Sequence, residues 1–122
     1  MKMNKKYLPQ EIEVWYVIPS IRRELAKAMA KKGLSQKKIA SILGVTGAAV
    51  SQYISHKRAK EVIFLADMVS EIERSAERIM ENNDALIEEL QRLLDLVKKS
   101  RTLCTIHHKY GTMPLKCEAC MH

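Results

Sequence analysis

The regular spacing of apolar residues in the second half of the chain constrains the fold most. From Val62 to Val97 they recur at alternating intervals of three and four residues, interrupted only at Asn83. Such spacing places side chains on one face of a helix, as at the a and d positions of a heptad. A stripe of this length needs a partner surface to cover it. Its members are Val62, Leu65, Val69, Ile72, Ala76, Ile79, Leu86, Leu90, Leu93 and Val97.

The interruption of the stripe allows two interpretations. In one, a single long helix carries Asn83 as a buried polar residue that specifies register. In the other, the chain breaks at Asn82-Asn83, and Asp84 is the N-cap of a second helix. We favour the break, because two asparagines before an aspartate make a poor helix interior.

The first half of the chain is also predicted to be helical. Pro9 can open a short helix, and Pro19 suits the first turn of the next one, where an N–H would lack a partner anyway. Gly33 then stands where a left-handed residue ends that helix. No convincing pair of strands is found, so we expect an all-α fold. The apolar stripe of the second helix is Ile21, Leu25 and Met29.

Two short helices joined by a tight turn are expected next. Ser35 is a good N-cap for a helix over Gln36–Leu43, and Gly44 ends it. Thr46 can cap the following helix, which runs to about Ser55. The spacing of the apolar residues lets the first helix of this pair lie across the second.

Charge divides the chain into two unequal halves. Residues 1–60 hold 13 Lys and Arg against 3 Asp and Glu, whereas residues 61–122 hold 8 against 11. The basic half is therefore expected to meet a polyanion, and the second half to do something else. No signal peptide and no membrane span are readable. We expect a cytoplasmic protein without a membrane partner.

Residues 34–58, LSQKKIASILGVTGAAVSQYISHKR, resemble the helix-turn-helix of the Xre family, the lambda-repressor and Cro-like DNA-binding domains. With the flanking helices, the resemblance extends over about residues 9–60. The whole layout is similar to archaeal regulators of this class that carry a cysteine-bearing tail. The resemblance implies a lambda-repressor-like bundle that binds double-stranded DNA.

The resemblance also implies roles for individual residues. Gln36 matches a phosphate-binding position, and Lys57 and Arg58 match a basic pair after the recognition helix. The base-reading face corresponds to Thr46, Gly47, Ala48, Ser51 and Gln52.

The chemistry of these residues agrees with those roles. Gln52 can pair with adenine through two hydrogen bonds, and Ala48 can meet a thymine methyl group. Gly47 departs from the family pattern, since glycine inside a helix costs about 1 kcal/mol relative to alanine. His56 also departs, because the family often has glycine there. The lysines and arginines expected at phosphates are Lys31, Lys32, Lys37, Lys38, Lys57, Arg58 and Lys60.

The last segment of the chain has the spacing of a metal site. Cys104 and His107 form one ligand pair, and Cys117 and Cys120 form another, each with two residues between the ligands. Two such pairs can close a tetrahedral site. Zn²⁺ is the expected metal, with an iron–sulfur cluster as the alternative. His108 is a second choice for the histidine ligand.

These observations predict a dimeric, sequence-specific transcription regulator and not an enzyme. Residues 1–60 would form the DNA-binding domain, 61–101 a coiled-coil-like dimerisation arm, and 102–122 the metal-binding tail. The homodimer would read a pseudo-palindromic operator. Two alternatives use the same helix pair. One is a bridging, coactivator-type adaptor with little sequence preference, and the other is an antitoxin.

Overall fold

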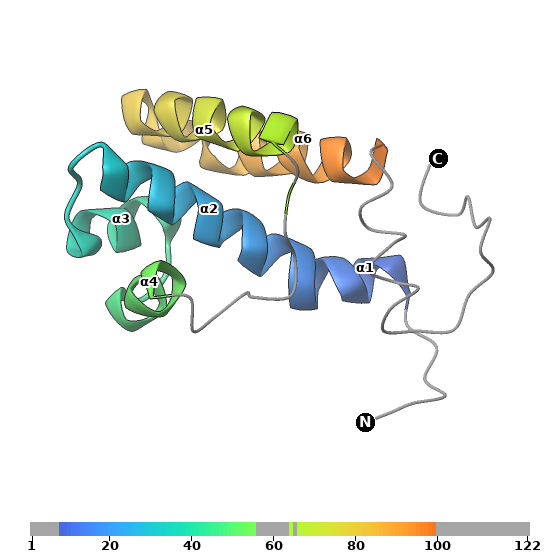
Figure 1. The fold of residues 1–122 in the computed structure, drawn as a ribbon, viewed down its shortest axis with the longest axis horizontal. Coiled ribbons are helices and arrows are strands. Elements are labelled where there is room, and N and C mark those ends of the chain that lie inside the picture. Colours follow the sequence, from blue (N-terminus) through green and yellow to red (C-terminus); the bar gives the residue numbers. More distant parts are fainter. Residues whose placement is uncertain (1–7, 56–63, 65, 100–122) are drawn as a thin grey trace.

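The computed structural model describes residues 8–55, 64 and 66–99, and every element in this part of the chain is a helix (Figure 1). This confirms the expected all-α class. The first helices in chain order are α1 (Pro9–Ile12), a π-helical stretch η1 (Glu13–Val17) and α2 (Ile18–Lys31). The helix pair α3 (Gln36–Leu43) and α4 (Gly47–Ile54) comes next. The last are α5 (Ala66–Glu81), a 3₁₀ turn η2 (Asn83–Ala85) and α6 (Leu86–Lys99).

The first three helical segments follow each other without a break. Ile12 and Val17, at their junctions, both have right-handed helical backbone angles. Pro19 lies in the first turn of α2, as expected. Its missing N–H removes one hydrogen bond to the preceding turn, which accounts for a wider helical turn just before it.

The predicted helix ends between α2 and α4 are present in the structure. Gly33 has a φ of 94° and Gly44 a φ of 70°, values that glycine adopts without steric cost. The Ser35 hydroxyl accepts from the Lys38 N–H at 3.1 Å, and the Thr46 hydroxyl accepts from the Ala49 N–H at 3.0 Å. These two caps fix where α3 and α4 begin.

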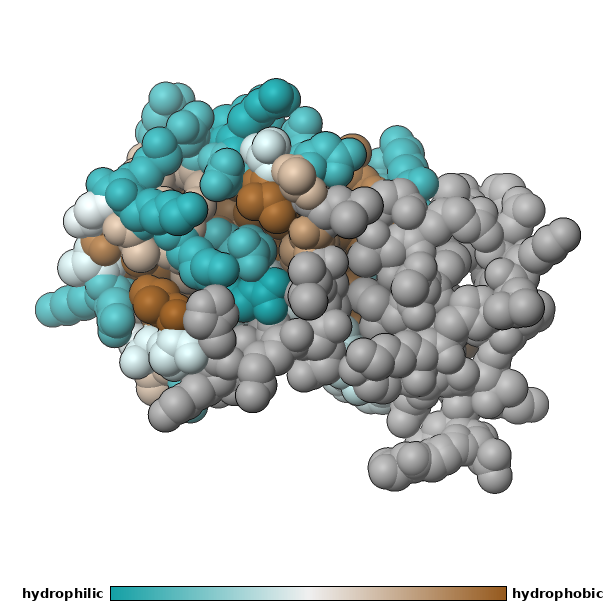
Figure 2. Space-filling model, in the orientation of Figure 1, coloured by the Kyte–Doolittle hydropathy of each residue, from teal (hydrophilic) through white to brown (hydrophobic). Residues whose placement is uncertain are grey.

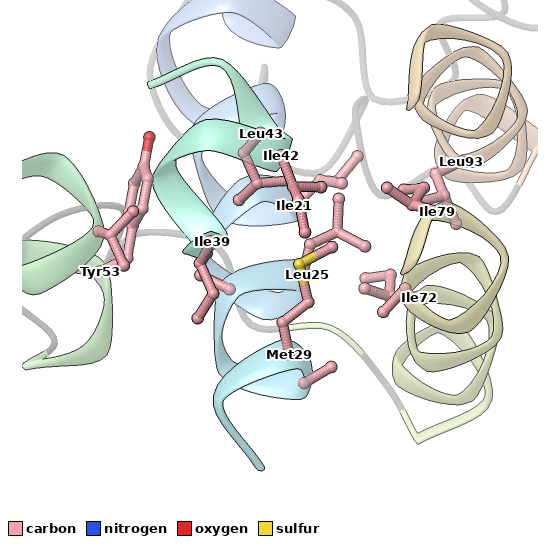
Figure 3. Packing of buried hydrophobic residues seen from close by; sticks show 14 of the residues in the cluster. Ile21, Leu25, Met29, Ile39, Ile42, Leu43, Tyr53, Ile72, Ile79 and Leu93 are labelled. Carbon is pink, nitrogen blue, oxygen red and sulfur yellow. The ribbon is translucent and has the colours of Figure 1, made fainter. Parts of the chain in front are cut away.

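Helix α2 is the centre of the core. Ile21, Leu25 and Met29 are fully buried, which confirms the expected stripe. Figure 3 shows this stripe between two groups of apolar side chains. Residues of α3 and α4 lie on one side, and residues of α5 and α6 lie on the other.

Much of the heptad stripe within the described residues is therefore covered by the chain itself. Ile72, Ala76, Ile79 and Leu93 are all fully buried and belong to the same apolar cluster as the α2 stripe. The partner surface that the stripe requires is provided by α2 and by the packing of α5 against α6. One core thus spans the position of the expected boundary at residue 60.

The helix is interrupted at Asn82, so two helices form and not one. Asn82 has an extended backbone (φ −145°), and its side-chain oxygen accepts from the Asp84 N–H at 3.1 Å. Asn82 therefore caps η2, and the expectation of Asp84 as the N-cap of the second helix was wrong, because Asp84 lies inside this 3₁₀ turn. An asparagine with extended backbone can hydrogen-bond the N–H two residues on, which favours it at this position.

A polar cluster joins α5 to α6 and consists of Glu71, Ser75, Arg78, Glu89 and Arg92. The Ser75 hydroxyl donates to Glu89 Oε1 at 2.7 Å, and Arg92 Nε donates to the same oxygen at 3.2 Å. Arg92 also reaches Glu71 Oε1 at 2.9 Å. We refer to these five residues as the α5–α6 polar cluster.

None of the helices in the described ranges is long and apolar enough to cross a membrane. On the face seen in Figure 2, hydrophilic side chains cover most of the described surface, and apolar residues show only as separate small patches.

Candidate nucleic-acid interface

The two short helices α3 and α4 are held on α2 by their apolar sides. Ile39 and Val50 are fully buried, and Leu43 and Tyr53 nearly so. Figure 3 shows Ile39 and Tyr53 facing each other between α3 and α4. This packing fixes the orientation of α4 relative to the central helix.

The opposite side of α4 is open to solvent. Thr46, Gly47, Ala48 and Ser51 are exposed, and Gln52 is half-buried. Residues 48, 51, 52 and 55 recur at helical spacing, so they share one face of α4. The structure therefore brings the five residues predicted to read bases to one outward-facing surface, which we call the α4 face.

Small side chains cover most of the α4 face. The Thr46 hydroxyl oxygen already accepts from the Ala49 N–H, but its hydrogen can still be donated. A Cβ added to Gly47 would meet nothing within 4 Å, and its backbone angles are ordinary. An α-helix with its side chains is about 10–12 Å across, which suits the width of a DNA major groove.

Basic side chains lie at the start of α3. Gln36, Lys37 and Lys38 occupy its first turn, and all three are exposed. This helix has no acidic residue in that turn. Cations at a helix N-terminus oppose the helix dipole, so two lysines there weaken the helix and are not explained by its stability. A phosphate bound there would neutralise the lysine charges and would also interact favourably with the helix dipole.

The charged residues of the helix pair, and of the segments next to it in the sequence, are all of one sign. The sequence has no Asp or Glu between Glu24 and Glu61. Lys31 and Lys32 end α2 just before α3, and Lys32 Nζ lies 3.0 Å from Glu77 Oε2 on α5. Of these two lysines, Lys32 is thus partly neutralised by the second half of the chain.

Several predicted site residues lie outside the described residues. These include the basic pair Lys57 and Arg58. The four predicted metal ligands, Cys104, His107, Cys117 and Cys120, also fall there. Within residues 8–55, 64 and 66–99, no group of three or more His, Cys, Asp or Glu side chains can hold a metal. The metal site in the tail therefore stays a prediction.

Shifted pKa values are found in the α5–α6 polar cluster, on the other side of α2 from α4. The hydrogen bond from Arg92 lowers the pKa of Glu71. Burial raises the pKa of Glu89, but hydrogen bonds from Ser75 and Arg92 outweigh it and leave the pKa below its usual value. Burial also lowers the pKa of Arg92, and its bonds to Glu71 and Glu89 raise it overall. This cluster has a structural role in joining two helices.

The α5–α6 polar cluster was not predicted from the sequence. No family model matches the chain, and no curated protein or solved structure does either. The function therefore has to be inferred from the residues of the α4 face and their surroundings.

Proposed function

We propose that this protein is a sequence-specific, dimeric DNA-binding transcription regulator, and that α3 and α4 act as a helix-turn-helix. In this proposal α4 enters the major groove and reads base edges with its exposed face. The observation that carries it is the combination of five small or amide-bearing residues on the α4 face with exposed lysines in the first turn of α3. Base reading and phosphate binding then come from adjacent helices.

The residues of the α4 face suit direct contact with bases. The Gln52 amide can pair with adenine N6 and N7, and Ser51 can hydrogen-bond to any base edge. Ala48 and the Thr46 methyl group offer apolar contacts for thymine. Since Gly47 has no side chain, the backbone of α4 can approach the DNA closely.

The lysines position the protein without reading sequence. Lys37 and Lys38 bind phosphates beside Gln36, and Lys57 and Arg58, which follow α4 in the sequence, are proposed to add further phosphate contacts. Contacts of this kind carry affinity and make it depend on salt. In a two-fold symmetric dimer, two copies of α4 enter successive major grooves roughly 34 Å apart.

The Cys/His tail is proposed as a structural or sensory metal site. Its three thiols and one imidazole suit Zn²⁺, with an iron–sulfur cluster as the alternative. The donors must be deprotonated to bind, so metal binding would compete with protons.

The experiment that tests the proposal is selection of duplexes from a random-sequence DNA pool by the full-length protein. We expect an enriched, two-fold symmetric motif whose half-sites are about 10 base pairs apart, one helical turn. Affinities for the selected duplex and for a scrambled one are then measured by fluorescence anisotropy at one salt concentration.

Two variants and one control separate base reading from phosphate binding. Gln52→Ala should lose roughly 5- to 150-fold in affinity for the selected duplex, the equivalent of about 1–3 kcal/mol. Its affinity for scrambled DNA should not change. Lys37→Ala should weaken binding to both duplexes and reduce the salt slope. Gln10→Ala, an exposed glutamine on α1, should match the wild type.

Other outcomes would point to other functions. Binding without any enriched motif would favour the adaptor, and tighter binding to single- or double-stranded RNA than to DNA would contradict the proposal. Enrichment that survives Gln52→Ala, Ser51→Ala and Thr46→Ala together would exclude the α4 face as the reading surface.

A further inference from the structure

Exposed apolar side chains gather at the start of the described chain. Four large apolar residues are exposed among the described residues, and three of them, Leu8, Val14 and Trp15, precede α2. Val14 is 59% exposed and Trp15 is 48% exposed, and both lie on η1. We call these two residues the η1 face. The fourth exposed residue, Ile87, lies on α6.

The π-helical turn accounts for the exposure of Val14 and Trp15. Ile12 and Val17, five residues apart, are both fully buried, and the hydrogen bonds of a π-helix join residues five apart. Residues midway round such a turn face away from its buried side. The backbone that buries Ile12 and Val17 thus holds Val14 and Trp15 toward solvent.

The last turn of α6 lies beside the η1 face. Ile18, at the start of α2, and Leu94, in the second half of α6, are walls of one groove. In Figure 1 the two helices run in opposite directions, and the end of α6 lies at the same end of the molecule as α1. Val14 precedes Ile18 by about one turn, and Lys98 follows Leu94 by about one turn. The chain therefore leaves α6 next to Val14 and Trp15.

The segment that follows α6 carries apolar residues and is too short to bury them by itself. Residues 100–122 lie outside the described residues, and their sequence begins with Leu103 and Ile106 as its first large apolar residues. A segment of this length cannot form a core of its own, so these residues need another surface. Among the exposed apolar residues that the structure describes, those of the η1 face are nearest to the start of this segment, since Ile87 lies about 18 Å back along α6 from Lys99.

Charge also favours contact between the segment and the first helical stretch. Residues 8–18 hold Glu11 and Glu13 and no Lys or Arg. The residues after position 99 hold three Lys and Arg against one Glu, and Arg101 and Lys109 flank the first two large apolar residues. Opposite charges around an apolar contact favour this partner over others.

We propose that residues 100–122 of the same chain dock on the η1 face, with Leu103 and Ile106 packed on its two residues. Docking removes the apolar side chains of both partners from water together. It also brings the predicted metal ligand Cys104 next to η1, which continues directly into α2. The segment thereby gains a contact with the helix that supports α4.

This inference rests neither on DNA binding nor on metal binding, so it can fail separately from the proposed function. Trp15 is the single tryptophan of the chain, so its fluorescence reports on the η1 face directly. The full-length protein is titrated with acrylamide, and the quenching constant and the emission maximum are measured at about 1 µM and about 50 µM protein, a range that covers micromolar association. Docking within one chain makes both quantities independent of protein concentration.

Two double variants separate docking from a mere change of charge. Leu103→Asp with Ile106→Asp should weaken docking at least about tenfold, because carboxylates would have to leave water for an apolar surface. The emission of Trp15 should then shift to longer wavelength, and its quenching constant should rise. Thr102→Asp with Thr105→Asp adds the same charge at neighbouring polar positions and should match the wild type. Equal quenching in the wild type and the Leu103/Ile106 variant would overturn the inference. A wild-type quenching constant that changes with protein concentration would also overturn it, since a second copy would then be the occupant.

Trypsin cleavage tests the contact from the side of the η1 face. Val14→Asp should raise the rate of cleavage after Arg101 and Lys109 roughly three- to tenfold, because cleavage follows the undocked fraction of the segment. Ile87→Asp is the matched control, since Ile87 is 66% exposed and lies away from the η1 face, and it should be cleaved as the wild type is. Equal cleavage rates in these two variants would contradict docking on the η1 face.

Discussion

Replacing Glu89 by alanine should destabilise the protein strongly, although Glu89 is a charged residue near the surface of a small helical fold. Its side chain is 9% exposed, and its Oε1 accepts from Ser75, from Arg92 and, at 3.4 Å, from Arg78. Breaking a buried ion pair by removing one partner costs about 3–5 kcal/mol. Arg92 keeps its bond to Glu71 and is 32% exposed, so part of this cost is relieved. We expect a loss of about 2–3 kcal/mol in the free energy of unfolding.

The same cluster makes stability depend on pH in a defined direction. Hydrogen bonds lower the native pKa of Glu71 and Glu89 below the ordinary value of 4.5. A carboxylate with a lowered native pKa stabilises the fold fully above its unfolded-state pKa. That contribution is lost as the pH falls through the native pKa. The wild type should therefore lose stability below about pH 4.5, and Glu89→Gln should lose less over the same range.

The assay is urea unfolding at one protein concentration, followed by far-ultraviolet circular dichroism at pH 7 and at about pH 3.5, below the ordinary glutamate pKa. Glu73→Gln, an exposed carboxylate on the same helix α5, is the control and should change the free energy of unfolding by less than about 0.5 kcal/mol. A Glu89→Ala variant within that margin at pH 7 would refute the structural role of the cluster. So would an acid dependence in Glu89→Gln equal to that of the wild type.

Three further predictions concern the turns, the tail and the binding surface. Gly44→Ala should lower the free energy of unfolding by about 1–2 kcal/mol, because Gly44 has a φ of 70°. Gly47→Ala should raise it by up to about 1 kcal/mol, because there is open space for a Cβ at Gly47. Thermal unfolding of both variants measures these changes. Elemental analysis of anaerobically purified protein should find either zinc without colour, or iron with sulfide and a brown absorbance. The double variant Cys117→Ser with Cys120→Ser should lose the metal. An equal metal content in that variant would exclude the tail site. The logarithm of the DNA association constant should fall with the logarithm of salt with a slope of about −5 to −7 for six to eight phosphate contacts, and a slope near zero would exclude DNA binding.

The helix ends could be predicted from the sequence because each depends on a few adjacent residues. Ser35 and Thr46 cap the helices that follow them, and Gly33 and Gly44 have the positive φ expected at helix ends. The exposure of the α4 face also follows from local spacing, once the apolar side of that helix is recognised. The error at Asp84 is local too, since both Asn82 and Asp84 are good caps and only the backbone path selects between them.

Contacts between helices could not be predicted in the same way. A heptad stripe shows that a face must be covered, but it does not show whether the same chain or another chain covers it. The bonds of Glu89 to Ser75 and Arg92 depend on how α6 folds back on α5, which no spacing in the sequence encodes.

The position of α2 at the centre of the core links the two halves of the chain physically. Its buried stripe contacts the apolar sides of α3 and α4 on one side and those of α5 and α6 on the other (Figure 3). A close-packed core transmits a change in one layer to the next, because it contains few voids to absorb it. A change in how α5 and α6 pack on α2 would therefore act on the helix that supports α4. The orientation of the proposed DNA-reading surface thus depends on both halves of the chain.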